Sequence, residues 1–358
     1  LPEQNSLSLS IQRQLSGSMV LEASYNGVIG SHLQAGLLNY NQVPFSALAK
    51  YGATLLNSRA DSQAAIDAGI KLPFPNFMTL WGSRGTVAQA LRPFPQYTTI
   101  NTWDGNGDHS GHSSYHAAIF KLDKRFAQGG TFTTSYVFSK LISDADSYWI
   151  TDQARAADHY NRSLEKSIGS YDATHNFKFA GVYNLPFGKG QKLMNGGIGA
   201  WILGDWRVAF IGTYNTGRPV GLSTSVSTPL QAGRSVPWIT TYDGWRAPTK
   251  GDSFNPAVDS FWQPASFFGP QPSNTIGNQT RFNPRQRELP AFNENISISK
   301  EFRVHEGMHF ELRGEAFNAF NRVRFAVGDT NVTSATFGKV TGVYNSPRQI
   351  QVGAKFQF

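Results

Sequence analysis

Apolar and polar residues alternate one by one along much of the chain, and the alternation is clearest at its end. Ile350, Val352, Ala354, Phe356 and Phe358 share one parity, and polar residues or glycine fill the positions between them. Side chains of a β-strand point alternately to its two faces, so this segment predicts a strand with one apolar and one polar face. The same pattern predicts eight further strands, at residues 6–14, 19–26, 114–126, 131–141, 175–185, 201–215, 292–302 and 308–318.

The connections between these strands alternate in length. Residues 15–18, 127–130 and 304–307 predict tight hairpins, and residues 186–190 begin a slightly longer turn. Between the hairpins lie four long loops, at residues 28–113, 142–174, 216–291 and 319–347. In an antiparallel sheet, this alternation places all tight turns at one end and all long loops at the other. Outer-membrane barrels have that asymmetry, with short periplasmic turns and long extracellular loops.

Strand length and number refine the fold class. Most of the predicted strands have about nine to fifteen residues, enough for a tilted strand to cross a bilayer. With nine strands the first and the last run in the same direction, whereas single-chain bacterial barrels close with an even number. We therefore predict an all-β, antiparallel transmembrane β-barrel that is partial, with residues 1–358 forming one domain from the C-terminal portion of a larger barrel. A tenth strand at 336–344 would make the number even but would place Phe358 at the loop end.

Composition excludes several other classes. The 35 Gly and 18 Pro among 358 residues are too many for a helical bundle, and 13% aromatic residues are too many for a disordered chain. The most apolar window, residues 196–206, contains Asp205 and is too short for a membrane helix. The net charge of +8 is dispersed, so we expect no nucleic-acid partner. The chain has no Cys, so it can form no disulfide. It opens at Leu1 without a start Met, so we expect preceding residues to have been removed.

A series of short motifs has a fixed order along the chain. They are SIQRQL at 10–15, LEASY at 21–25, ALRPFPQY at 90–97, SYHA at 114–117, KRF at 124–126, SYVFSK at 135–140, YNR at 160–162, Asp172 with His175, LPFG at 185–188, EAFNAFN at 315–321 and SPRQIQVG at 346–353. In order and spacing these motifs resemble TonB-dependent outer-membrane receptors, specifically the barrel of the Oar-like subgroup. The resemblance covers nearly the whole chain.

The resemblance implies parts that this chain lacks. Such receptors have about 22 strands, a plug domain inside the lumen and a TonB box that couples transport to the inner-membrane proton gradient, and Oar-like members add an N-terminal β-sandwich. We therefore expect this chain to form barrel wall and ligand-binding loops of an energy-coupled transporter in the outer membrane of a Gram-negative bacterium. Its expected partners are outer-membrane lipid and lipopolysaccharide, the barrel-assembly machinery, the TonB complex through the missing N-terminal part, and an unidentified ligand. No cofactor is expected.

The last strand resembles a barrel-assembly signal. Ile350, Val352, Phe356 and Phe358 match the alternating apolar residues and terminal aromatic by which the assembly machinery captures a final strand. A free strand edge can be paired by another edge through β-augmentation. The alternative is an ordinary edge strand that ends in Phe.

Aromatic residues in the long loops are candidates for ligand contact. The candidates are Trp149, Trp238, Tyr242, Trp245 and Trp262. Their rings could stack on sugars or bind a peptide, but they could equally form small cores that stiffen the loops or belong to an interfacial aromatic girdle. Polar residues expected on the inner face, whatever the substrate, are Gln12, Arg313, Glu315, Gln351 and Lys355.

Three weaker patterns suggest other chemistry. Asp104, Asn106 and Asp108 resemble the start of a calcium-binding EF-hand loop, but His109 stands where the loop requires Gly and Tyr115 where it requires Glu, so a turn-rich loop tip is the alternative. His109 and His112, with His116 beyond, could ligate zinc or copper but lack a further ligand of defined geometry. We expect no metal site.

Asp172 and His175 could act as an acid–base pair on the barrel rim. They stand where a long loop enters a strand, and no nucleophile accompanies them, so we interpret them as loop anchors and expect no enzymatic activity. Two alternatives to transport remain from the sequence. One is a surface protein in which the barrel anchors adhesive loops, and the other is an outer-membrane hydrolase.

Overall fold

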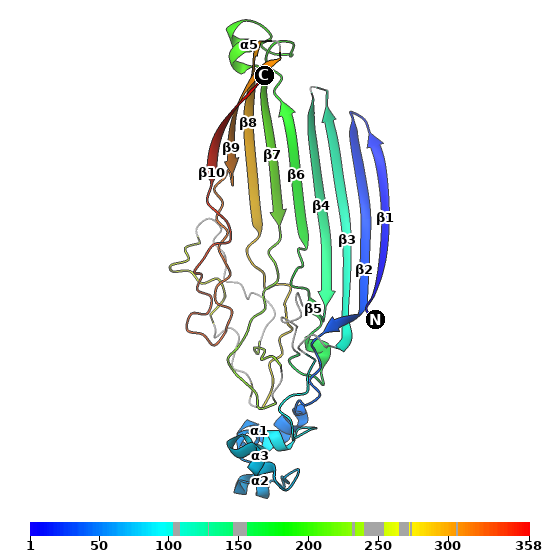
Figure 1. Ribbon diagram of the computed structural model, residues 1–358, viewed down its shortest axis with the longest axis vertical. Coiled ribbons are helices and arrows are strands. Elements are labelled where there is room, and N and C mark those ends of the chain that lie inside the picture. The colour runs from blue at the N-terminus through cyan, green and yellow to red at the C-terminus, as the bar shows by residue number, and fades with distance from the viewer. Residues whose placement is uncertain are drawn as a thin grey trace.

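The computed structural model describes all residues except 103–107, 128, 146–155, 231–232, 240–253, 265–271, 273 and 306. In this part of the chain, ten strands form one antiparallel sheet in the order β1-β2-β3-β4-β6-β7-β8-β9-β10, with the short β5 paired to β4 (Figure 1). The strands are β1 (Glu3–Leu15), β2 (Met19–Ala35), β3 (Asp108–Phe126), β4 (Gly130–Ser143), β5 (Ser167–Ile168), β6 (His175–Asn184), β7 (Trp206–Asn215), β8 (Ala291–His305), β9 (Met308–Phe317) and β10 (Gln349–Gln357).

The helices are short and lie outside the sheet. They are α1 (Phe45–Asn57), α2 (Gln63–Asp67), α3 (Phe77–Trp81), the 3-10 turn η1 (Gly82–Arg84), α4 (Val87–Ala90), η2 (Arg162–Leu164) and α5 (Gly197–Leu203). Helices α1 to α3 lie at the far end of the long loops, whereas α5 lies at the opposite end of the sheet, near the C-terminus (Figure 1). Within the described ranges, none of the helices is both long enough and apolar enough to span a membrane.

The predicted architecture is confirmed. Nine long strands follow one another in the sheet, tight turns gather at one end, and long loops gather at the other (Figure 1). Strands β1 and β10 occupy the two edges of this open sheet, and each has one hydrogen-bonded neighbour among the described residues. Residues 336–344 form turns and isolated bridges, so they do not supply a tenth long strand.

Several predicted boundaries were wrong. Strand β2 continues to Ala35 and β3 already begins at Asp108, so the first long loop spans only 36–107 instead of 28–113. The pairing of β2 with β3 shifts register after Gly30, and His32 there has a positive φ of 54°. This irregularity interrupts the alternation by which a strand is recognised.

One further correction concerns a helix. The start of the predicted strand 201–215 is in fact the end of α5, because a short apolar run fits a helix as well as a strand. Within the first long loop, the first turn of α2 is capped by the Ser62 hydroxyl, which accepts the Ala65 N–H.

The register assigns the two faces of the sheet. Directly paired residues of antiparallel strands lie on the same face, and one row of pairs that crosses seven strands is entirely apolar or aromatic: Ile11, Ala23, Phe120, Tyr136, Phe177, Tyr214 and Phe292. The next row is polar: Gln12, Glu22, Lys121, Ser135, Lys178, Thr213 and Asn293. We call these the outer and inner faces. The residues predicted to face inward all lie on the inner face.

Aromatic residues of the outer face include two bands, and Phe132, Phe179 and Phe210 lie between them. Near the long loops these are Tyr25, Phe138, Phe177, Tyr214 and Phe292, and near the tight turns they are Phe126, Tyr183, Trp206, Phe302, Phe310 and Phe356. On β7, Trp206 and Tyr214 are separated by about 26 Å at a rise of about 3.3 Å per residue. For a strand tilted by about 40°, this corresponds to about 20 Å along the barrel axis, somewhat less than the apolar band of about 25 Å in transmembrane barrels.

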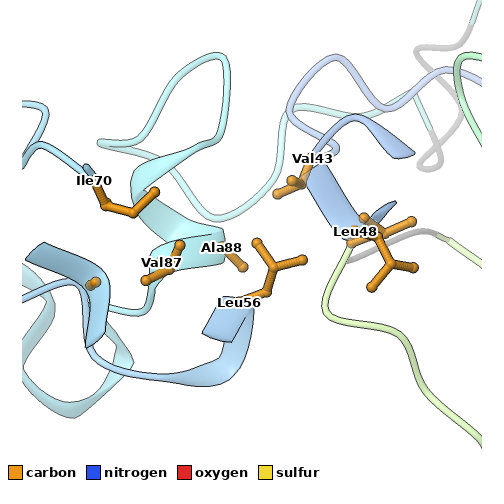
Figure 2. Close-up of a cluster of buried hydrophobic side chains, with 8 residues drawn as sticks. Val43, Leu48, Leu56, Ile70, Val87 and Ala88 are labelled. Carbon is orange, nitrogen blue, oxygen red and sulfur yellow. The ribbon is translucent and has the colours of Figure 1, made fainter. Parts of the chain in front are cut away.

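Buried apolar side chains gather between the long loops rather than on the sheet. The first cluster joins Val43, Leu48, Leu56 and Val87 of the β2–β3 loop to Leu230 of the β7–β8 loop (Figure 2). The second joins the β7–β8 loop to the β9–β10 loop, and the third joins the β2–β3 loop to the β4–β6 loop. All four long loops are therefore packed into one body, which we call the loop cap: the described residues of 36–107, 144–174, 216–290 and 318–348.

The face assignment predicts responses of different size to a cation placed on the two faces of one strand. Leu122→Arg, on the outer face of β3, should lower the free energy of unfolding of the full-length protein by about 2–4 kcal/mol, because it places a cation in hydrocarbon. Ile119→Arg, on the inner face of the same strand, should lower it by less than about 1 kcal/mol. Urea titration in lipid vesicles measures both, and equal costs would contradict the assignment.

Candidate functional site: the inner furrow and the loop cap

The inner face of the sheet carries a furrow with a cavity volume of about 380 Å³ between β4 and β9. The apolar side chains that point into it are Ala180, Val182, Ala209, Ile211 and Phe317. Polar side chains border them: Thr131, Thr133, Asn295, Ser297 and Glu315. The inner face is polar over most of the sheet, so this apolar surface is a local exception, and it offers contact area to a molecule or domain inside the lumen.

A buried carboxylate connects two loops of the cap. Glu165, in the β4–β6 loop, is fully buried. Its Oε2 accepts from Arg281 Nη2 at 2.8 Å and its Oε1 from Arg234 Nη2 at 3.1 Å, both from the β7–β8 loop, and Oε1 also accepts the Ala157 N–H at 2.7 Å. Burial alone would raise the pKa of Glu165, but the two guanidinium groups outweigh it and hold the pKa below its usual value. Glu165 is therefore ionised at neutral pH.

A second ion pair fixes the base of the cap to the wall. The Asp172 carboxylate accepts the Leu141 N–H of β4 at 2.8 Å, the Thr174 hydroxyl at 2.8 Å and Arg287 Nη2 at 2.8 Å. Arg287 also donates to the Gly217 carbonyl at 3.0 Å, where the β7–β8 loop leaves the sheet. Every oxygen of Asp172 is thus engaged in holding loops, in agreement with the interpretation of Asp172 as a loop anchor.

Hydrogen bonds of a buried amide add a third connection. The amide of Gln42, which is fully buried in the first loop, donates to Asp158 Oδ1 at 2.7 Å and accepts the His159 N–H at 2.7 Å. Buried polar groups of this kind are costly unless they are paired. The cap is consequently held by specific partners, and the loops have one defined arrangement relative to one another.

The predicted loop aromatics lie in different places. Trp262 is fully buried in the second cluster, where its ring meets Phe261 edge to face at 4.7 Å between centroids. This is the small-core arrangement that the sequence left open, and a ligand would have to displace that packing to reach it. Trp238 is half-buried beside Ile239. Trp149, Tyr242 and Trp245 lie outside the described residues.

The proposed calcium and acid–base patterns can be placed only in part. Asp104 and Asn106 lie outside the described residues, whereas Asp108 opens β3 and accepts from the Thr102 hydroxyl at 2.7 Å and the Leu37 N–H at 3.2 Å. His175 Nδ1 pairs with the Tyr136 hydroxyl at 2.7 Å on the outer face rather than with Asp172. Within the described ranges, no group of three or more His, Asp or Glu side chains is arranged to hold a metal ion.

The candidate assembly residues share one exposed face. Ile350, Val352 and Phe356 lie on the outer face of β10, at an edge of the sheet, and are 50–74% exposed, while Phe358 follows the strand and is 98% exposed. Its ring lies 6.2 Å from that of Phe356. Their role as an assembly signal remains a prediction.

Of the residues that hold the loop cap, Glu165, Arg234 and Arg281 were missed in the sequence. Glu165 and Arg281 are separated by 116 positions, and neither belongs to a periodic segment. A weak signal was present, because charged residues are scarce in this chain and several of the arginines fall within long loops.

Long antiparallel strands, a lipid-compatible outer face between two aromatic bands, and a mainly polar inner face define the wall of a transmembrane β-barrel. The chain belongs to the outer membrane beta barrel domain family, which matches residues 1–351, and it is located in the outer membrane of a Gram-negative bacterium. No match to the chain is found among curated proteins.

Three solved structures are similar to the whole chain at low identity. They are the outer membrane transporter YddB from Escherichia coli (8% identity, TM-score 0.47), FpvAI in its complex with pyocin S2 (8%, 0.40) and P. aeruginosa FpvA bound to heterologous pyoverdine with iron (7%, 0.39). The chain covers 33%, 28% and 27% of these proteins, respectively, so it spans about a third of their length or less.

The buried carboxylate allows the loop cap to be tested. Glu165→Gln should destabilise the cap by about 3–5 kcal/mol, because it leaves the buried Arg281 and the half-buried Arg234 guanidinium groups without a counter-charge. Hydrogen exchange should then become faster in residues 156–168 and 276–287. Asp61→Asn, which removes an exposed ion pair with Arg59 in the same cap, is the matched control and should leave exchange unchanged. Equal effects of both substitutions would rule out Glu165 as the tie between the loops.

The lowered pKa of Glu165 also fixes the direction of the pH response. A carboxylate with a lowered native pKa stabilises the fold fully above its ordinary pKa of 4.5. That contribution is lost as the pH falls below this value toward the native pKa. The protection factor in the cap, which is the intrinsic exchange rate at each pH divided by the observed rate, should therefore be constant from pH 7 to about pH 5 and fall in more acidic solution. In Glu165→Gln, the acid-induced step in the same residues should be smaller.

Proposed function

We propose that this chain forms part of the wall and the extracellular loops of a TonB-dependent transporter of the Oar-like type. The observation that carries the proposal is the apolar furrow of the inner face. A water-filled pore requires a polar lining, whereas Val182, Ile211 and Phe317 would be poorly solvated in such a channel. An interior domain packed against the furrow accounts for these residues, and the ordered sequence motifs support the same class of receptor.

Transport by such a protein requires parts supplied from outside residues 1–358. In this proposal, a plug domain covers the furrow, a TonB box couples it to the inner-membrane gradient, and the loop cap captures a ligand too large for ordinary porins. The partners are an unidentified ligand, the TonB complex, the assembly machinery and outer-membrane lipid with lipopolysaccharide. The proposal needs no cofactor, metal or catalytic residue in this chain.

Reading the open reading frame before Leu1 is the direct test. A signal peptide, a TonB box, a plug and further strands are the expected result, and they would establish a gated transporter whose ligand is then the remaining question. A stop codon or an unrelated domain at that place would remove energy coupling from the account.

The furrow predicts a leak when its apolar surface is disrupted. In the full-length protein, Ile211→Glu should weaken the packing of the interior domain and make cells more sensitive to vancomycin, a large hydrophilic antibiotic that an intact outer membrane excludes. Thr213→Glu, two residues further on the inner face of β7 and outside the furrow, is the matched control and should leave sensitivity unchanged. Equal sensitivity of both variants and the parent would show that nothing seals the lumen at the furrow.

A second candidate function is adhesion, and the loop cap favours it. Three clusters and several buried ion pairs hold the loops in one arrangement, as suits a surface that presents a fixed epitope to a partner. The two functions differ in their need for energy. A ligand that accumulates inside cells only when the energy-coupling complex is intact indicates transport, whereas surface binding that is equal with and without that complex indicates adhesion.

A further inference from the structure

Helix α5 lies at the tight-turn end of the sheet (Figure 1). The side chain of Lys300, on the outer face of β8, donates to the carbonyls of Trp201, Ile202 and Gly204 at 2.7, 2.9 and 2.7 Å. These carbonyls belong to the end of α5, where the helix leaves acceptors unsatisfied and carries partial negative charge. Lys300 is only 4% exposed, so its three N–H groups are used entirely to hold the helix.

Two further contacts fix the helix in place. Trp206, the first residue of β7, donates its indole N–H to the Ile202 carbonyl at 3.0 Å, and the Trp201 ring lies 6.2 Å from that of Phe302. The turn that precedes the helix packs against the end of α5 at Gly188. A Cβ atom at this position would lie 2.5 Å from the Cα of Gly204. Only glycine allows this approach of the two backbones. Helix α5 is therefore fixed to the wall by specific contacts.

The free side of this helix is apolar. Ile198 is 77% exposed, Trp201 69% and Ile202 51%, and α5 contains neither an acidic nor a basic residue. A soluble protein would normally bury such a surface. In the preceding turn, the exposed Lys189 and Lys192 place two cations beside it.

The position of the helix identifies what covers this surface. Trp201 contacts Phe302, and Phe302 continues through Phe310 into the aromatic band near the tight turns, so the apolar surface of α5 is continuous with the lipid-facing wall. Tryptophan at such a boundary and basic residues beside an apolar helix are typical of segments that lie in the membrane interface. Lysine also attracts anionic headgroups.

We propose that α5 and the turn before it form a lipid-binding foot in the periplasmic leaflet of the outer membrane. Acyl chains of phospholipid cover Ile198, Trp201 and Ile202, while Lys189 and Lys192 bind the phosphate of an anionic phospholipid headgroup. Lys300 holds the foot against the wall. The inference rests on the membership of the outer-membrane barrel family and is independent of any transport activity.

Site-directed spin labelling tests the foot directly, since this chain contains no Cys. The label is placed at Ile198→Cys in the full-length protein, with any cysteines outside this chain replaced by serine, in vesicles of phosphatidylethanolamine and phosphatidylglycerol. Phe120→Cys, on the lipid-facing wall, and Gln63→Cys, on an exposed helix of the loop cap, are the matched controls. We expect the label at 198 to collide more with oxygen than with a water-soluble nickel chelate, as at 120 and unlike 63.

Three results would overturn the proposal. One is nickel accessibility at 198 equal to that at 63. Another is dipolar broadening between labels, which would show that a second copy covers the helix. The third is shielding that occurs in native membranes but not in vesicles, which would assign the surface to a periplasmic protein.

The headgroup part of the proposal has its own test. Replacing both Lys189 and Lys192 by Glu should abolish the added immobilisation of the label at 198 when phosphatidylglycerol replaces phosphatidylcholine. Lys50 and Lys71 in the loop cap, changed in the same way, serve as the control for charge alone and should leave that difference intact. Identical phosphatidylglycerol dependence in both double variants would overturn the assignment of the headgroup site.

Discussion

The structure depends on one constraint: every backbone N–H and C=O inside hydrocarbon must be paired within the protein. The antiparallel ladder from β1 to β10 meets this constraint at every internal strand, and the strict two-residue period of the side chains follows from it. Once the ladder is formed, each position has a fixed neighbour environment. The outer face can be made of Ile, Phe and Tyr and the inner face of Gln, Lys and Glu because the ladder never changes parity between the aromatic bands.

The loop cap obeys a different rule, because water surrounds it. Its segments have little regular hydrogen bonding, and they are held instead by three apolar clusters and by buried charges such as Glu165 with Arg234 and Arg281. The wall and the cap meet at Asp172, whose carboxylate bonds to a strand N–H on one side and to Arg287 of a loop on the other. A ligand arriving from outside would therefore meet surfaces whose spacing is already set.

The wall could be predicted from the sequence because its information is local. Alternation identified all nine long strands, their faces and the open sheet, and the tight turns followed from short Gly-rich connections such as Gly17 and Gly129–Gly130. The errors were at places where alternation stops or becomes ambiguous: the irregularity near His32, and the apolar run of α5, which has no period long enough to distinguish helix from strand. The loop cap was out of reach, because the pairing of Glu165 with Arg281 joins residues with no local pattern to connect them.

The three clusters of the loop cap each contain side chains from two loops, and together they connect all four. A loop of this protein is therefore not an interchangeable module. Leu230 belongs to a cluster whose other buried members lie in the first loop. A graft that replaced the β7–β8 loop alone would therefore leave a cavity beside the unaltered first loop. Variation of the outer surface during evolution, or its redesign in the laboratory, has to change the four loops together, or else confine itself to positions that no cluster includes.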